Sequence, residues 1–391
     1  MDAKTFAAML TDKKMTDLKK MQHKYSVSDV SEFVSILQQS FFTPLPLLDF
    51  NGNPLVYLES VTQVSMKPSK ILLTRRPDSG NYSFKAMTDE IQASLAIENI
   101  ETSRESIRRI LKGYAPENKN ENRLYGMKKG LDFISDPVNK ITEKNIHRLY
   151  MMTVGDFLEA QNRLPEGNFY RHDAVYIIGD RIEHQGLAAD KLPEYMGRLV
   201  AFIQIADTMH DLLKAVAIHF YLAYLHPYFD GNGRMARLLH LWYLVQQGYS
   251  ATLFIPFSNH IDASRKKYYQ AYTQTEANAR ISGVVDITPF LNYFIEAVYH
   301  QFTPITTSQK ESLAGYEKAL ADGVITEKEK ALFSFVLTAY GNDEFSTKQL
   351  EKDFGDAAYA TIRSFVLKFT GMELLMVRKY GNRNKYRIGQ P

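Results

Sequence analysis

The sequence predicts a mainly α-helical protein, with a small α/β unit at its N-terminus and a winged-helix unit at its C-terminus. Three observations lead to this prediction. Apolar residues recur at helical spacing through most of residues 88–302. Two shorter runs have the apolar arms and turn residues of β-hairpins. A compact pattern of three short helices and a further hairpin follows residue 326.

The composition is that of an ordinary globular chain of 391 residues, long enough for two or three domains. The net charge of +3, from 47 basic and 44 acidic residues, is too small to indicate nucleic-acid or membrane binding by the whole chain. The absence of cysteine excludes disulfides, thiolate nucleophiles and cysteine-ligated zinc. There is no signal-like N-terminus and no apolar run that could cross a bilayer, so we expect a cytoplasmic protein with no membrane partner.

Residues 1–87 form the expected N-terminal unit. Residues 16–39 are amphipathic, and residues 47–58 place two apolar arms around Asn51-Gly52, a strong hairpin signal. This combination predicts helices followed by one hairpin.

Residues 88–302 form the expected helical core, which one hairpin interrupts. Its arms are Ala174–Ile178 and Arg181–Glu183, with Gly179-Asp180 between them. We therefore expect a β-hairpin inserted among helices.

A connecting segment is expected over residues 303–325, and a winged helix over residues 326–391. The helices and strands expected in the winged helix are Glu327–Ala339, Thr347–Phe354, Ala357–Phe369, Glu373–Lys379 and Lys385–Ile388.

The run from His226 to Arg237 is the most informative part of the chain. It reads His-Pro-Tyr-Phe-Asp-Gly-Asn-Gly-Arg-Met-Ala-Arg. The helix expected over residues 212–225 ends here, because Pro227 disfavours helical geometry in the residue before it. The Gly-rich turn that follows opens onto a helix N-terminus, where backbone N–H groups and the helix dipole favour an anion such as phosphate.

Several kinds of ligand coincide in this run. His226 is suited to act as a general base near neutral pH. Asp230 offers a carboxylate oxygen for Mg²⁺, and Arg234 and Arg237, three residues apart, can reach the same anion. Gly-Asn-Gly alone is equally typical of a surface turn. The whole set favours a site for phosphoryl or nucleotidyl transfer.

This run resembles the signature of the Fic family: His-Pro-Phe, one residue, Asp or Glu, Gly-Asn-Gly-Arg, two residues, Arg. Every position agrees except Tyr228, where Phe is usual. Fic proteins transfer AMP from ATP to a Tyr, Thr or Ser hydroxyl of a protein. The resemblance implies that His226 deprotonates that hydroxyl and that Asp230 holds Mg²⁺. It implies ATP contacts for Gly231, Asn232, Gly233, Arg234 and Arg237. Glycine at position 233 favours AMP transfer, since the phosphorylating Doc branch has lysine there.

The resemblance covers about residues 88–300. It implies that the hairpin after Phe169-Tyr170-Arg171 is a flap that pairs with the backbone of a target segment; the alternative is a hairpin that only caps the bundle. The flap residues are Val175, Tyr176, Ile177 and Ile178. The resemblance also places Tyr269 and Tyr272 at an adenine pocket, although aromatic residues at helical spacing are more often core.

A second motif precedes the core. The segment from Ser94 to Asn99 resembles the Fic inhibitory motif: Ser or Thr, three residues, Glu, then Gly or Asn. The resemblance implies an inhibitory helix over about residues 90–110, in which Glu98 pairs with Arg237 and occupies the guanidinium that the γ-phosphate needs. Ser94, one turn earlier, is expected to hydrogen-bond toward the motif. In some relatives this glutamate assists removal of AMP, so de-adenylylation stays open.

The remaining histidines and the C-terminal basic residues have plainer interpretations. We expect His184, His219 and His240 to be structural rather than metal ligands. The C-terminal hairpin carries a basic cluster, but its third helix offers only Arg363 and Lys368, so protein contact is favoured over DNA binding. The basic cluster consists of Arg378, Lys379, Arg383, Lys385 and Arg387.

Three functions follow from the sequence. The first is an adenylyltransferase that uses ATP and Mg²⁺ to modify a protein hydroxyl and itself, restrained by Glu98. The second is a DNA-binding regulator in which the Fic core is a sensor. The third keeps the site but uses another donor, such as UTP or CDP-choline. Homodimerisation and the identity of the target are left open.

Overall fold

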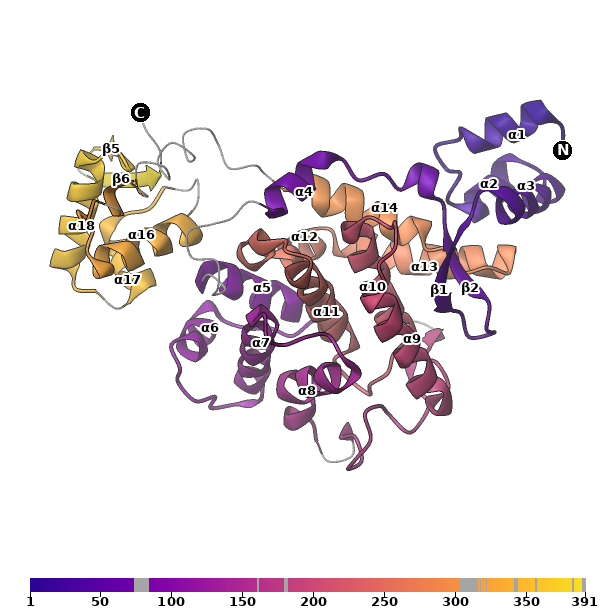
Figure 1. The fold of residues 1–391 in the computed structure, drawn as a ribbon, viewed down its shortest axis with the longest axis horizontal. Helices are drawn as coiled ribbons and strands as arrows, with labels where there is room; N and C mark the ends of the chain where they lie inside the picture. The colour runs from indigo at the N-terminus through magenta and orange to yellow at the C-terminus, as the bar shows by residue number, and fades with distance from the viewer. Residues whose placement is uncertain are drawn as a thin grey trace.

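The computed structural model places a central helical bundle between an N-terminal unit and a C-terminal unit (Figure 1). The residues that it describes are 1–73, 84–159, 162–178, 182–302, 316, 318–320, 322–340, 344–355, 357–381 and 383–388. Helices predominate, so the prediction of a mainly α fold is confirmed. Among the described residues, no helix is both long and apolar enough to cross a membrane.

The N-terminal unit contains short helices and one antiparallel hairpin. Its elements are α1 (Ala3–Leu10), α2 (Leu18–Lys24), α3 (Val27–Ser40), β1 (Thr43–Leu48), β2 (Pro54–Tyr57), η1 (Glu59–Val61) and α4 (Met66–Leu73). The amphipathic run over residues 16–39 is divided, because the Ser26 side chain caps the start of α3. Helices α1 to α3 have a small hydrophobic core of their own.

The β1–β2 hairpin packs against the central bundle. The buried Asp49 carboxylate accepts hydrogen bonds from the backbone N–H groups of Asn51 (2.9 Å) and Asn53 (2.8 Å), and this closes the turn. Backbone bonds between Val56 and the chain around Asp286 attach β2 to the bundle. As a result, the ring of Phe50 at the hairpin tip stacks on Tyr224, with 4.2 Å between centroids.

The central bundle is built around an antiparallel pair of helices, α10 and α11, that are buried along nearly their whole length. The motif that begins at His226 is the turn between them (Figure 1). The helices and strands of this region are α5 (Phe84–Ile97), α6 (Arg104–Leu111), α7 (Lys119–Ser135), α8 (Glu143–Thr153), η2 (Gly155–Phe157), β3 (Tyr176–Ile178), β4 (Ile182–Gln185), η4 (Ala189–Lys191), α9 (Leu192–Gln204), α10 (Asp211–Leu225), α11 (Asn232–Gln246), η5 (Ser250–Phe254), α12 (Phe257–Ala263), α13 (Arg265–Ser282), α14 (Thr288–Ala297) and η6 (Tyr299–Gln301).

The C-terminal unit has a separate hydrophobic core. Its elements are α16 (Glu327–Ala339), α17 (Thr347–Phe354), α18 (Tyr359–Gly371), β5 (Leu375–Tyr380) and β6 (Arg383–Ile388). Strands β5 and β6 pair antiparallel, with Leu375 opposite Ile388 and Tyr380 opposite Arg383. These elements lie where the sequence placed them, whereas their assignment to the winged-helix class stays a prediction. Most of the expected linker, residues 303–315, lies outside the described residues.

Candidate active site

His226 lies at the end of α10 in a left-handed backbone conformation, with φ 53° and ψ 58°. For a residue with a side chain this conformation costs roughly 1–3 kcal/mol, so the surrounding structure must hold it. Two bonds from Arg171 do so: its Nε donates to the His226 carbonyl (2.8 Å), and its backbone N–H donates to the Pro227 carbonyl (3.0 Å). The strained residue is therefore fixed by the segment that leads into the flap.

Arg171 is a residue of this candidate site that sequence reasoning missed. Its side chain is 2% exposed, and its guanidinium also donates to the carbonyls of Asp173 and Leu187, on the two sides of the flap. Burial lowers the pKa of Arg171. The family resemblance included the segment Phe169-Tyr170-Arg171. The role of Arg171 could not be predicted, because its partners are backbone carbonyls and these leave no pattern in the sequence.

The ring of His226 is oriented to act as a base. Its Nδ1 lies 3.3 Å from the Ala223 carbonyl, an acceptor, so Nδ1 carries the proton and Nε2 is left with a lone pair. Burial lowers the pKa of His226 to about 4, and the nearby His184 and Arg171 act in the same direction. At neutral pH the imidazole is therefore uncharged and able to accept a proton.

The Gly-rich turn is closed by its own side chains. Asn232 accepts a hydrogen bond from the Tyr228 N–H (3.0 Å) and donates to the Tyr228 carbonyl (2.8 Å), so its amide braces the turn. Gly231 has φ +80°, and a Cβ there would lie 2.6 Å from Val154. Helix α11 starts at Asn232 without a side-chain cap. Its first backbone N–H groups therefore suit an anion.

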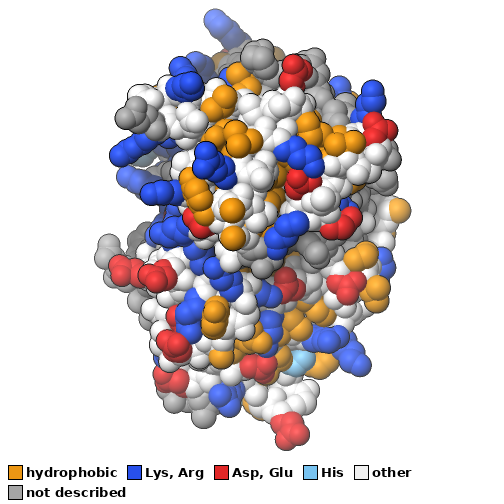
Figure 2. Space-filling model, turned by 90° about the vertical axis from the view of Figure 1, so that its left-hand side faces the viewer, with side chains coloured by type: hydrophobic (Ala, Val, Ile, Leu, Met, Phe, Trp, Pro, Cys, Tyr) orange, Lys and Arg blue, Asp and Glu red, His pale blue; other side chains and the backbone are white. Residues whose placement is uncertain are grey.

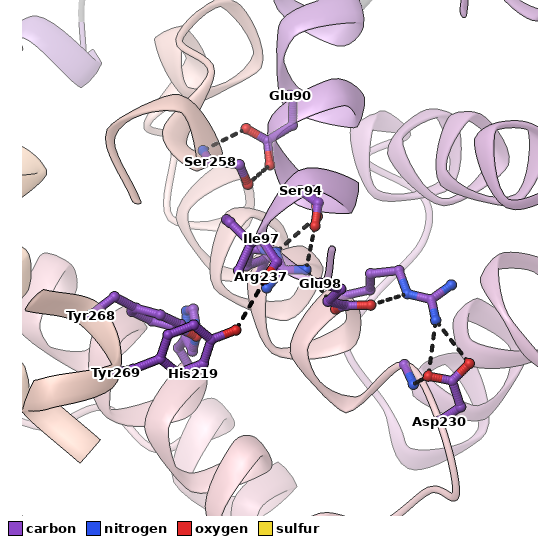
Figure 3. A network of polar contacts seen from close by, with 12 residues as sticks. Glu90, Ser94, Ile97, Glu98, His219, Asp230, Arg237, Ser258, Tyr268 and Tyr269 are labelled. Carbon is purple, nitrogen blue, oxygen red and sulfur yellow. Dashed lines mark hydrogen bonds and ion pairs between the residues drawn. The ribbon is translucent and has the colours of Figure 1, made fainter. Parts of the chain in front are cut away.

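The Glu98 carboxylate bridges both arginines of the motif (Figure 3). Oε2 accepts from Arg234 Nε (2.8 Å), and Oε1 accepts from Arg237 Nη2 (2.7 Å). Arg237 also donates to the Ser94 hydroxyl (2.8 Å) and carbonyl (2.9 Å), one turn earlier in α5. The sequence predicted the contact of Arg237 with Glu98 and a hydrogen bond from Ser94 toward the motif, and it missed Arg234 as a second partner of Glu98. The expected inhibitory helix over about residues 90–110 is wrong as a single helix: α5 ends at Ile97, Asn99 has a left-handed φ of 57°, and α6 begins at Arg104.

Gly233 lies directly beneath this bridge. A Cβ at this position would lie 2.8 Å from Glu98 Oε1 and 3.1 Å from Arg237 Nη1. Both distances are tighter than ordinary contacts. A side chain at 233 is therefore incompatible with the observed position of Glu98.

The Asp230 carboxylate is the candidate magnesium ligand. Its side chain is 45% exposed, and both oxygens lie 3.2 Å from Arg234 Nη2. The described residues contain no cluster of three or more His, Cys, Asp or Glu side chains that could hold a metal. The fit to magnesium is thus that of a single protein ligand, which phosphate oxygens and water must complete.

A cavity of about 720 Å³ connects these groups. Tyr269 lines it with a half-exposed ring, and the Tyr269 hydroxyl donates to the Ile97 carbonyl (3.1 Å). Tyr272 also lines it, but is packed against Phe290 with 4.4 Å between centroids. Phe50 forms part of the far wall. Sequence reasoning missed Phe50, because a hairpin tip far away in the chain carries no signal for a pocket.

The flap hairpin lies beside this cavity. Tyr176 pairs with Gln185, and Ile177 with His184, in an antiparallel ladder. The Gly186 N–H donates to the Val175 carbonyl (3.0 Å), which continues the pairing. Residues 179–181, and the side chains of Ile177, Ile178, Ile182 and Glu183, lie outside what the structure describes.

His219 and His240 are buried in the core, as expected for structural histidines. Their Nε2 atoms contact the hydroxyls of Tyr268 (2.9 Å) and Tyr299 (3.1 Å). Burial lowers the pKa of His219 and brings that of His240 to about 3, so both are neutral.

Comparison with known proteins agrees with this geometry. Residues 138–244 match the model of the Fic/DOC family. The protein adenylyltransferase Fic of Drosophila yakuba is 28% identical over 153 residues, covering 37% of this chain and 28% of that protein. Its counterpart in Drosophila erecta is 27% identical over 175 residues, covering 43% of this chain and 31% of that protein. Residues 138–244 of the chain therefore carry a Fic/DOC-family domain.

A solved Fic family protein from Desulfovibrio desulfuricans superposes with a TM-score of 0.47 and 20% identity, over 78% of this chain and 87% of that one. That similarity is too low to support a conclusion. The chain spans less than a third of the length of the two Drosophila proteins, 28% and 31%.

Proposed function

We propose that this protein is an adenylyltransferase that transfers AMP from ATP to a Tyr, Thr or Ser hydroxyl of a target protein. One observation carries the proposal: a neutral His226 with a free Nε2 shares a single cavity with Asp230 and an uncapped helix N-terminus. The names of the Drosophila relatives support the same reaction.

The reaction follows from the placement of these groups. Nε2 of His226 takes the proton of the target hydroxyl, whose oxygen attacks the α-phosphorus of ATP. The bond from that phosphorus to the oxygen bridging it to the β-phosphate breaks, and pyrophosphate leaves. The first N–H groups of α11 and the guanidinium of Arg234 stabilise the negative charge that develops. A magnesium ion held by Asp230 and the phosphates would neutralise the leaving group.

The flap is proposed to present the target. Strand β3 is paired with β4 along one side. Its other side can add an extended segment through backbone bonds. Such pairing requires little of the target's side chains and sets its register above His226.

Glu98 is proposed to restrain the reaction. It occupies the two guanidinium groups that the phosphates of ATP would otherwise contact. ATP bound beside Glu98 then lacks the geometry needed for in-line attack, so turnover falls.

The test is intact-mass analysis after incubation with ATP and Mg²⁺. Wild type and Glu98→Gly should gain an AMP-sized adduct, more in the variant, and His226→Ala should gain none. Parallel incubations with UTP or CDP-choline identify another donor. The absence of any adduct from Glu98→Gly with any of these donors would overturn the proposal.

A second candidate function rests on the C-terminal unit. Lys and Arg side chains are spread over the end of the molecule that holds it (Figure 2). The five basic side chains of the β5–β6 hairpin are exposed, and Arg378 has Glu344 at 3.6 Å. If this surface binds DNA, filter binding should weaken steeply as salt rises, because phosphate contacts release counterions. Binding that does not respond to salt, or no binding, would exclude that role.

A further inference from the structure

His184, in strand β4, lies between two hydrogen-bond acceptors. Its Nδ1 is 2.7 Å from Oε1 of Glu276, in α13, and its Nε2 is 2.7 Å from the backbone carbonyl of Tyr224, in α10. The side chain of His184 is 13% exposed and that of Glu276 is 25% exposed. These bonds connect the flap to two helices of the bundle.

This arrangement fixes the protonation of the ring. A neutral imidazole donates from one nitrogen only, whereas a carbonyl and a carboxylate are both acceptors. Two short contacts of this kind therefore require a proton on each nitrogen, and Glu276 supplies the counter-charge. Among the side chains that the structure describes, the other charged or titratable groups around the pair are Arg280, 3.9 Å from Glu276 in the same helix, and Tyr224, whose ring is 5.5 Å from that of His184. His226 and Arg171 lie on the side of the base.

The two hydrogen bonds of His184 hold the part of strand β4 that pairs with β3. His184 is paired with Ile177, so fixing His184 fixes the middle of strand β3. Tyr224 is two residues before His226, so the bond from His184 to the Tyr224 carbonyl also fixes the position of the flap relative to the base. The next backbone bond, from Leu187 to the Leu225 carbonyl (3.1 Å), continues the attachment.

We propose that His184 is a positioning residue: as an imidazolium it clamps strand β4 to α10 and α13, and so sets the height and register of β3 above His226. The role in target presentation rests on the proposed function, whereas the clamp itself does not. The ring of His184 is 6.5 Å from that of His226, centroid to centroid. A positive charge there also keeps the base unprotonated, in line with the lowered pKa of His226.

The first test measures hydrogen exchange of the flap by mass spectrometry, with no nucleotide present. In His184→Gln, the backbone of residues 182–187 should exchange at least tenfold faster (about 1.4 kcal/mol of lost protection). The matched control, His23→Gln, replaces an exposed histidine of α2 and should leave the flap unchanged. Unchanged flap exchange in His184→Gln would overturn the clamp.

The second test observes the ring protons, which a purely packing role would not fix. In proton–nitrogen NMR of protein labelled with ¹⁵N-histidine, both ring nitrogens of His184 should carry a proton, with the signals assigned by their loss in His184→Gln. In Glu276→Gln, the amide can donate to a neutral ring, so one of the two N–H signals should disappear. A single ring N–H in wild type would contradict an imidazolium clamp.

Activity separates this inference from the proposed function. In the Glu98→Gly background, His184→Gln should lower the rate of AMP labelling at saturating ATP about tenfold or more, with the ATP concentration for half-maximal rate changed less than about threefold. A change confined to that ATP concentration would overturn the positioning role. If Glu98→Gly itself takes up no AMP, the proposed function fails, while the exchange results still decide the clamp.

Discussion

At the scale of single residues, the site is organised by buried charges that share partners. Glu98 neutralises two guanidinium groups whose side chains are only 2% and 3% exposed. Ser94 and Asp230 provide additional hydrogen bonds to these same groups. The consequence is a closed network. Under the proposed function, ATP phosphates would have to replace a carboxylate rather than enter empty space.

This network makes a prediction about stability. Removing one member of a buried ion pair costs about 3–5 kcal/mol, because the other charge is left without a partner. Glu98→Gln keeps the shape and some hydrogen bonds, so we expect a loss of about 2–3 kcal/mol in the free energy of unfolding. ATP should raise the melting temperature more in this variant than in wild type, since its phosphates replace the missing charge. Denaturant titration with and without ATP measures both; equal stability of the two proteins would contradict the network.

The pKa of His226 makes a prediction about pH. With a folded-state pKa of about 4, the base is neutral throughout the physiological range. In Glu98→Gly, kcat/KM for AMP labelling should therefore not fall between pH 7 and pH 5.5, and should decline only toward pH 4. The same shift removes stability as pH falls from about 6.5 to 4, because the unfolded chain binds the proton first. A decline in kcat/KM centred near pH 6.5 would show that His226 is not buried as observed.

The sequence predicted the part of the site that is contiguous. The run from His226 to Arg237 stands out in the sequence, and the pairing of Arg237 with Glu98 was implied by the resemblance to the Fic inhibitory motif. The structure brings these residues together. Arg171 and Phe50 could not be predicted, because one bonds backbone carbonyls and the other enters from a distant hairpin. Both roles depend on tertiary placement, which leaves no periodic pattern in the chain.

At the scale of elements, the β1–β2 hairpin shows most clearly which features the sequence predicts and which depend on packing. The Asn51-Gly52 turn was expected from the sequence, but its function was not: the turn carries Phe50 onto Tyr224 at the cavity wall. The helices of the C-terminal unit were predicted closely, because caps such as Thr326 and Ser346 mark their starts. Local capping thus identifies boundaries, whereas the partner of a loop tip is decided by packing.

The hairpin turn can be tested through Asp49. Its carboxylate is 3% exposed and accepts from two backbone N–H groups. Asp49→Ala leaves those donors buried without a partner, so we expect a loss of about 1–3 kcal/mol in the free energy of unfolding. Asp49→Asn retains an acceptor oxygen and should lose less. Equal losses from both substitutions would show that the hydrogen bonds do not hold the turn.

At the scale of the whole molecule, the C-terminal unit contacts the bundle at two helices: α16 packs against α5, and a polar contact joins the unit to α6. Arg108 donates to Asp353 Oδ1 (2.7 Å), and Tyr340 donates to Oδ2 of the same carboxylate (3.0 Å). Lys112 packs against Gly355, where any Cβ would lie 2.6 Å from its Nζ. The two units have separate hydrophobic cores, so their relative placement depends on contacts between their surfaces, namely α16 against α5 and this polar contact.

Because Arg108 and Asp353 form an ion pair between the two units, reversing the charge of either residue should weaken their docking. Asp353→Arg places two like charges together, and we expect about 1–3 kcal/mol of lost docking energy. Small-angle X-ray scattering should then show a larger radius of gyration, while circular dichroism shows unchanged helix content. Arg108→Asp should have the same effect, and the double variant, with the charges exchanged, should recover most of the compact form. If each single variant scatters like wild type, the ion pair does not hold the units together; if the double variant stays expanded, the effect of the single changes is not the loss of this pair.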